Sequence, residues 1–180
     1  MTDQLAAPKT WPRRADVRRR AVASIRKEFP NWPEDALTDG VKLKTVAGDA
    51  VSVPRVWAAV AGEFADENVS LKADAMDKAS TIGKLADLVR RGLHSGRVRA
   101  ILAAAWRSTV SKPGDLQDDE KASASVGDAT AMQAILGATP AGIEAGLSLP
   151  IAEVLPGAAL GRTWAQIVTQ FVDRIDEVDP

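Results

Sequence analysis

The chain has 180 residues, of which 46% are hydrophobic and 26% charged, and its formal net charge is -1. This is the balance of a globular protein, and a net charge so close to zero excludes a general electrostatic attraction to nucleic acid or to an anionic membrane. The chain has no cysteine, which excludes disulfide bonds, a cysteine nucleophile and thiolate metal sites.

The composition predicts an all-α fold. Alanine, leucine and valine are abundant, aromatic residues make up only 4%, and no segment shows the clear alternation of a half-buried strand. The first residues lack the apolar core of a secretion signal, and no apolar run reaches the roughly 18 residues that a membrane span needs. We therefore expect a cytoplasmic protein without a membrane-spanning helix.

Residues 1–14 contain two prolines and little apolar periodicity, so they are predicted to form a flexible tail. A helix is predicted over residues 15–29, with an apolar stripe at near-helical spacing. The stripe consists of Val17, Ala21, Ile25 and Phe29. Pro30 and Pro33 end this helix, because proline lacks the backbone N–H that a helix interior needs.

After a long loop, the next helix is predicted to begin just beyond Asp49, whose carboxylate can accept hydrogen bonds from free backbone N–H groups. Pro54 lies near its first turn, where a missing N–H costs least. Its apolar face consists of Val53, Val56, Trp57, Val60 and Phe64. This pattern predicts an amphipathic helix with one buried face.

A further helix is predicted to begin at Ser80 or Thr81. Its apolar side consists of Ile82, Leu85, Leu88 and Val89. Residues 94–110 continue this helix or form another one, with a break near Gly92 or Gly96. The hydrophobic residues of this second stretch are again spaced as on one face of a helix.

Residues 111–128 are polar, acidic and rich in small side chains, which predicts a linker. Beyond it, three helical segments are predicted over residues 129–136, 143–155 and 163–178. Glycine and proline separate them, and Pro150 is expected to kink or split the middle one.

The segment DAVSVPRVWAAVAGEF, residues 49–64, resembles the second helix of acyl carrier and peptidyl carrier domains. In that family an Asp-Ser-Leu motif begins the helix and a Glu-Phe pair lies near its end. Here Asp49-Ala50-Val51 and Glu63-Phe64 stand at the matching spacing. VRRRAVASIRKEF resembles the family's first helix, and STIGKL resembles the start of its last. The resemblance covers residues 15–92 and implies a small four-helix bundle.

Carrier domains attach a phosphopantetheine arm to the serine of that motif. This chain has Ala50 at the position, and alanine has no hydroxyl group, so the resemblance implies a carrier-like module without the cofactor. Ser52 lies about 200 degrees further round a helix, and it is the attachment residue only if the chain is a genuine carrier. The corresponding surface is usually acidic in the family, and Arg55 departs from this, which also argues against ordinary acyl carriage.

The second half carries a weaker resemblance to the same family. LGATP, residues 136–140, resembles the lead-in to the attachment motif, and RTWAQIV, residues 162–168, resembles a last helix. These segments imply that residues 129–180 are a second degenerate carrier-like repeat. The alternative is that they merely share the patterns common to amphipathic helices.

Arginine-rich stretches suggest a different function. They comprise Arg13, Arg14, Arg18, Arg19 and Arg20 near the N-terminus, and Arg90, Arg91, Arg97, Arg99 and Arg107 in the middle. Brought together, they would form a positive surface for phosphates, as in a regulator that binds nucleic acid. The alternative is a solvated helix face. Trp11 precedes the first arginines and is a candidate anchor for a protein partner, because tryptophan and arginine are enriched at binding hot spots.

The sequence thus predicts a non-enzymatic protein with a carrier-like bundle over residues 15–110, a linker over 111–128 and a smaller helical unit over 129–180. We expect it to bind another protein as an adaptor or scaffold, with no catalytic or metal-binding residues. The predicted interaction surface consists of Asp49, Ala50, Ser52, Arg55, Trp11, Arg13, Arg14, Arg18 and Arg19. A phosphopantetheine carrier modified at Ser52 and a nucleic-acid-binding regulator remain the alternatives, and the sequence does not identify the partner or the oligomeric state.

Overall fold

The computed structural model describes residues 11–67, 69, 75, 78–110, 115–147 and 159–178. Over these ranges the chain forms α-helices and short 3-10 helices and no strand, which confirms the predicted all-α class. None of the described helices is both long enough and apolar enough to cross a membrane.

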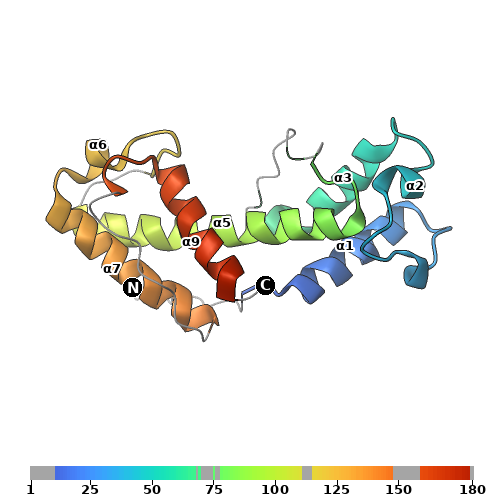
Figure 1. Cartoon of the computed structure of the whole chain (residues 1–180), viewed down its shortest axis with the longest axis horizontal. Helices are drawn as coiled ribbons and strands as arrows, with labels where there is room; N and C mark the ends of the chain where they lie inside the picture. The colour runs from blue at the N-terminus through green and yellow to red at the C-terminus, as the bar shows by residue number, and fades with distance from the viewer. Residues whose placement is uncertain are drawn as a thin grey trace, which may run out of the picture. The chain divides into compact units, whose positions relative to one another are not determined.

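The chain divides into two compact units, and the division differs from the expected one. The N-terminal unit is Pro12–Gly96, and the C-terminal unit is Arg97–Pro180 together with Met1–Trp11. The boundary falls inside the helix α5, Ile82–Val110, which Figure 1 shows as one uninterrupted helix. The glycines near this boundary predicted a break, but a helix tolerates an isolated glycine at a cost of about 1 kcal/mol relative to alanine.

The N-terminal unit packs its helices around one apolar core. Its elements are α1 (Arg14–Glu28), η1 (Glu34–Ala36), α2 (Leu43–Ala47), α3 (Val53–Glu63), η2 (Ala65–Glu67) and the first half of α5. The predicted stripes of α1, α3 and α5 supply the core, with Val17, Ile25, Val56, Phe64 and Leu85 almost completely buried. Helical periodicity therefore located these faces correctly.

The loop before α2 is bound to the start of α5. The backbone N–H of Ile82 donates to the carbonyl of Val41 over 3.0 Å, and the N–H of Gly83 donates to the carbonyl of Asp39 over 3.0 Å. A Cβ at Gly83 would lie 3.0 Å from the Cβ of Asp39, so a residue with a side chain there would push the loop away. Trp32 fixes the same region, because its indole N–H donates to the carbonyl of Val46.

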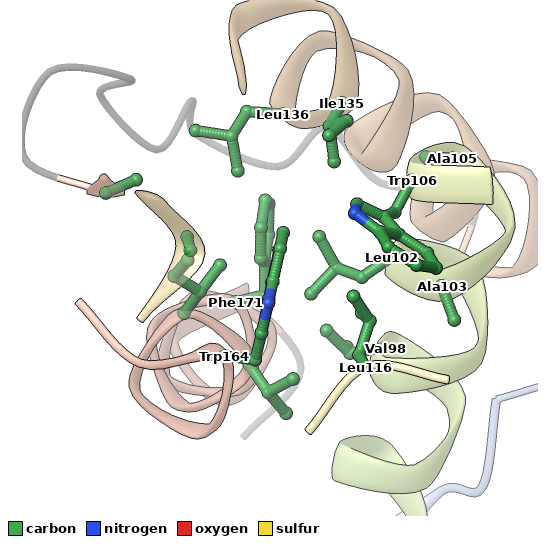
Figure 2. Packing of buried hydrophobic residues seen from close by; sticks show 14 of the residues in the cluster. Val98, Leu102, Ala103, Ala105, Trp106, Leu116, Ile135, Leu136, Trp164 and Phe171 are labelled. Atoms are coloured by element: carbon green, nitrogen blue, oxygen red, sulfur yellow. The ribbon is translucent and has the colours of Figure 1, made fainter. Parts of the chain in front are cut away.

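The C-terminal unit contains the second half of α5, α6 (Ala122–Val126), α7 (Ala129–Leu147) and α9 (Trp164–Val178). Figure 2 shows Trp164 and Phe171 of α9 side by side, facing Leu102 of α5. The indole N–H of Trp164 donates to the hydroxyl of Ser125 over 3.0 Å, which satisfies its polar atom inside the core. The aromatic pair therefore carries much of this core's buried area.

Part of the predicted linker is packed structure. Leu116 is 2% exposed in the core of the C-terminal unit, and α6 buries Ala122 and Val126. Residues 111–114 lie outside the described ranges. The segment is short of apolar residues, so composition suggested a linker, whereas Leu116, Ala122 and Val126 are buried in the core.

The helix α7 continues through a predicted break. Pro140 lies inside it, and the predicted interruption over residues 137–140 is absent. A proline inside a helix removes one backbone hydrogen bond without necessarily ending the helix. Gly142 allows close packing there, since a Cβ at this position would lie 2.8 Å from Cγ2 of Ile101. The predicted kink at Pro150 falls outside the described residues.

Candidate interaction surface at the start of α3

The predicted surface is formed by the turn that leads into α3. The short helix α2 ends at Gly48, whose φ of 86° lies in the left-handed region. Residues with a side chain are strained there, and glycine is not. Gly48 thus reverses the chain and places residues 49–52, which we call the α3 turn, in front of α3.

Asp49 holds this turn in shape. Its Oδ1 accepts a hydrogen bond from the backbone N–H of Ser52 over 2.6 Å, and its Oδ2 accepts one from the Ser52 hydroxyl over 3.2 Å. Donation by the Ser52 backbone and then by its hydroxyl lowers the pKa of the Asp49 carboxyl below its usual range. Ser52 is the residue before α3 begins, so Asp49 shapes the turn and does not directly cap the helix.

The α3 turn presents Ala50 and Val51 to solvent. Both side chains are exposed, and Val51 is 88% exposed, the one large hydrophobic residue so exposed in the described part of the chain. Val51 was not among the residues predicted for the interaction surface. Its position outside the apolar stripe of α3 was a signal that could have found it, because a side chain outside that stripe does not face the core.

The chemistry of the turn does not favour catalysis. A general base works best when its pKa is near the operating pH, whereas hydrogen bonding lowers the pKa of Asp49. The Ser52 hydroxyl donates to this weakly basic carboxylate. Ala50 offers only a methyl group. The turn is suited to contact with another molecule and has little that could activate a nucleophile.

Arg55 lies one helical turn further along and is paired. Its Nε donates to Oε1 of Glu28 over 2.9 Å, and its guanidinium lies 5.4 Å from the centroid of the Phe29 ring. The structure therefore places Arg55 close in sequence to the α3 turn but balances its charge with a carboxylate. We call residues 49–52 together with Arg55 the α3 surface.

The N-terminal arginines bind carboxylates. Arg14 pairs with Asp39 over 2.8 Å and with Asp87 over 2.6 Å, and Arg19 pairs with Asp16 over 2.8 Å. Arg18 pairs with Asp39 and also donates to the carbonyl of Leu37. The hydrogen bonds that Arg14 donates to the two carboxylates raise its pKa, and the bond to Asp87 contributes most. Arg18, followed by Arg14, lowers the pKa of Asp39.

The ion pairs of Arg14 and Arg18 link α1 to the loop before α2 and to α5, whereas that of Arg19 lies within α1. Arg20 is used in the same way, since it pairs with Glu63 and Glu67 while its guanidinium lies 4.2 Å from the centroid of the Phe64 ring. Arg99 pairs with Asp118 and Arg107 with Asp115 in the C-terminal unit. Arg20, Arg99 and Arg107 therefore pair with carboxylates of their own units.

Trp11 is not an exposed anchor. The ring is 7% exposed in the core of the C-terminal unit, and its indole N–H donates to the carbonyl of Ile143 over 3.1 Å. Arg14 already belongs to α1. Residues 1–10 lie outside the described ranges, and Arg13 immediately precedes α1. Of the nine residues predicted for the surface, the structure gathers Asp49, Ala50, Ser52 and Arg55 in one place.

His94, the only histidine of the chain, is completely buried. A histidine in a polar, arginine-rich stretch is expected to be exposed or to end a helix. Its Nε2 lies 3.3 Å from the carbonyl oxygen of Pro12, which is the first residue of the same unit. This contact fixes the chain in front of α1. The described contact of His94, with the backbone of Pro12, is structural and involves no nucleophile.

No protein-family model, no curated protein and no solved structure matches this chain. The α3 surface and the contacts around it are therefore the basis on which a function can be inferred.

Proposed function

We propose that this chain is a non-enzymatic, carrier-like helical module whose α3 surface binds another protein, without phosphopantetheine. The observation that carries the proposal is Val51, which is 88% exposed on a turn held by Asp49. Fully burying a side chain of this size contributes about 1.5–3 kcal/mol. A partner with an apolar pocket would gain this energy without having to order the turn, because the turn is already fixed.

Isolated exposed hydrophobic residues are common on protein surfaces, so position matters more than exposure. Ala50 and Val51 occupy the positions of the serine and leucine in the carrier motif. The neighbouring exposed residues of α3 are Pro54 and Ala58, which carry no charge, and Arg55, which pairs with Glu28. Apolar side chains around one fixed, exposed valine are suited to a protein contact, and Ala50 removes the hydroxyl that a carrier would need.

Photo-crosslinking tests the proposal directly. A photoreactive phenylalanine analogue placed at Val51 in the full chain, expressed in its native host, is expected to give a discrete adduct whose partner is identified by mass spectrometry. The matched control places the same analogue at Thr130, which is exposed at the start of α7. Equal labelling patterns from the two positions, or no adduct from Val51, would overturn a specific contact there.

Intact-mass measurement separates this function from that of a genuine carrier. The chain is coexpressed with a broad-specificity phosphopantetheinyl transferase, alongside a Ser52→Ala variant. We expect an unchanged mass for both proteins. A mass increase of one arm that disappears in the Ser52→Ala variant would establish the carrier alternative and refute our proposal.

A further inference from the structure

The two units use the same set of backbone hydrogen bonds between a loop and the start of a later helix. In the N-terminal unit the donor–acceptor pairs are Leu43 to Ser80, Ile82 to Val41 and Gly83 to Asp39. In the C-terminal unit they are Ala122 to Arg162, Trp164 to Glu120 and Ala165 to Asp118. An isolated antiparallel bridge accompanies each set, Lys42 with Thr81 and Lys121 with Thr163. We call these hydrogen bonds the loop framework.

The same side-chain clamp fixes the loop in both units. Arg18 pairs with the carboxylate of Asp39 and donates to the carbonyl of Leu37. In the C-terminal unit Arg99 pairs with the carboxylate of Asp118 and donates to the carbonyl of Leu116. Each aspartate also accepts a backbone N–H of the loop framework through its own carbonyl, so it connects three segments of its unit.

The turn before the next helix is repeated as well. Gly48 has a φ of 86° and Gly127 a φ of 84°. Asp49 accepts the backbone N–H of Ser52 over 2.6 Å, and Asp128 accepts the N–H three residues on, from Ala131, over 2.8 Å. Both units therefore end a short helix with a left-handed glycine and hold the following turn with an aspartate.

Most buried positions coincide when the units are aligned through these contacts. Residues 37–64 pair with residues 116–143 without a gap, and the buried pairs are Leu37 with Leu116, Val56 with Ile135, Trp57 with Leu136, Val60 with Thr139 and Phe64 with Ile143. The first helices pair Val17 with Val98, Ala21 with Leu102 and Ile25 with Trp106. The last helices pair Ile82 with Trp164, Leu85 with Ile167, Val89 with Phe171 and Leu93 with Ile175.

We infer that the chain is one helical unit used twice in tandem, and that the last helix of the first copy and the first helix of the second copy are fused into α5. The fusion explains why the boundary between the compact units, Gly96 and Arg97, falls inside a continuous helix. It also explains why no linker separates them. The inference goes beyond the proposed function, because it holds whether or not the α3 surface binds a protein.

The repeat corrects the alignment suggested by the sequence. The counterpart of Ala50 is Ala129, at the start of α7, and residues 136–140 lie in the interior of that helix. Both copies thus have alanine immediately after the aspartate. Asp49 is repeated as Asp128 because it holds a turn, so its presence needs no cofactor to explain it.

Some residues of the turn are shared by both copies, and others occur in one copy alone. The exposed Val51 corresponds to Thr130, and Arg55 corresponds to Ala134. Glycine, aspartate and the clamping arginine serve the fold in both copies. The large apolar side chain on the turn belongs to the first copy alone, which makes the second copy a natural control for it.

Amide hydrogen exchange measured by NMR on the full chain tests the repeat. In the unaltered protein, the six donors of the loop framework should exchange slowly in both units, because each is hydrogen-bonded to the backbone. Protection of the three N-terminal donors without protection of the three C-terminal ones would overturn the inference, whatever the variants below do.

Matched variants then test whether the clamps are equivalent. Asp39→Asn should accelerate exchange at Gly83 by about tenfold while leaving Ala165 unchanged, and Asp118→Asn should do the reverse. Asparagine keeps the shape and the backbone carbonyl but loses the charge that holds the arginine. A variant without a local effect, or two variants that affect the same unit, would contradict the repeat. Neither measurement involves a partner, so its failure is distinct from failure of the proposed function.

Discussion

At the scale of single residues, Val51 and Asp49 have opposite roles in the α3 turn. Asp49 gives the turn its shape through the hydrogen bonds that it accepts from Ser52. Val51 contributes almost nothing to the fold, since 88% of its surface faces solvent. A residue that the fold does not require can be changed without disturbing the structure, so its contribution to binding can be measured separately.

Val51→Thr should leave the free energy of unfolding within about 0.5 kcal/mol of the original, as is usual for exposed positions. The same change should weaken capture of the partner identified by crosslinking, because it replaces an apolar branch with a hydroxyl. Chemical denaturation and a binding titration measure the two effects. Thr130→Val is the matched control, and it should alter neither quantity appreciably. A loss of stability in Val51→Thr would show that the side chain packs against the fold.

Asp49 should titrate below its ordinary range, because donation by the Ser52 backbone and hydroxyl favours the carboxylate. NMR titration of the side-chain carboxyl gives this pKa directly. Ser52→Ala should raise the pKa only part of the way back, since the backbone N–H is the larger cause and remains. A complete return to the ordinary value would mean that the hydroxyl alone is responsible.

At the scale of elements, glycine marks where one helix stops and the next begins. Gly48 and Gly127 have positive φ angles, and no heavy atom lies within 4 Å of a Cβ built at either position. Backbone conformation, and not crowding, therefore requires glycine there. Gly62 also has open space around it but lies within α3 and has no positive φ.

Gly48→Ala and Gly127→Ala should each destabilise the protein by about 1–2 kcal/mol, the cost of a left-handed conformation for a residue with a side chain. Gly62→Ala should instead stabilise it by about 0.5 kcal/mol, because alanine is the better helix former. Denaturant midpoints of the three variants measure the contrast. Destabilisation by Gly62→Ala, or neutrality at Gly48, would contradict the assigned backbone conformations.

The clamp between α1 and its loop should make stability depend on acidity. Arg18 and Arg14 lower the pKa of Asp39 in the folded state, so the unfolded chain binds protons more readily than the folded one as the pH falls. The contribution is complete above the unfolded value of about 3.9 and is lost as the pH drops through the folded value.

Asp39→Asn should therefore lower stability at neutral pH by about 1 kcal/mol, a modest amount because the pair is partly exposed to solvent. The difference from the original protein should begin to shrink as the pH falls below about 4, where Asp39 of the unfolded chain becomes protonated, and should vanish as the pH drops through the lowered pKa of the folded state. Unfolding curves at several pH values measure this convergence. A constant difference across the range would show that charge is not the cause.

At the scale of the whole molecule, several arginines of the two stretches are already paired with carboxylates. Their prominence in the sequence predicted a positive patch, but Arg14, Arg18, Arg20 and Arg99 pair with carboxylates inside their own units. The net charge of -1 adds no long-range attraction. Nucleic acid would have to displace existing ion pairs before it could bind these side chains.

We therefore expect no measurable binding of duplex DNA at about 0.15 M salt. Fluorescence anisotropy with a labelled duplex, repeated at several salt concentrations, measures it. An Arg19→Glu variant, at an arginine that is largely exposed, serves as the comparison. Tight binding with a steep salt dependence that Arg19→Glu weakens would favour the nucleic-acid alternative.

Periodicity along the chain was sufficient for the buried faces of α1, α3 and α5 and for α9, but not for the short helices α2 and α6 or for the full lengths of α5 and α7. The stripes of α1, α3 and α5 and the position of α9 follow from apolar side chains at helical spacing, a property of local sequence. The same local information located Asp49, Ala50, Ser52 and Arg55 on one surface. It failed where a feature depends on distant residues, as for Trp11, which is buried in the core of the C-terminal unit and donates to the carbonyl of Ile143.

The sequence suggested a repeat in another register, and the register of the repeat that we infer comes from the tertiary structure. The aligned residues are mostly different in the two copies, so the sequence offered little identity by which to match them. What the copies share is a set of contacts, such as those of Asp39 and Asp118, between segments far apart in the chain. Sequence determined which residues form helices and turn inward, because those preferences are local. Only folding determined which loop each helix would bind.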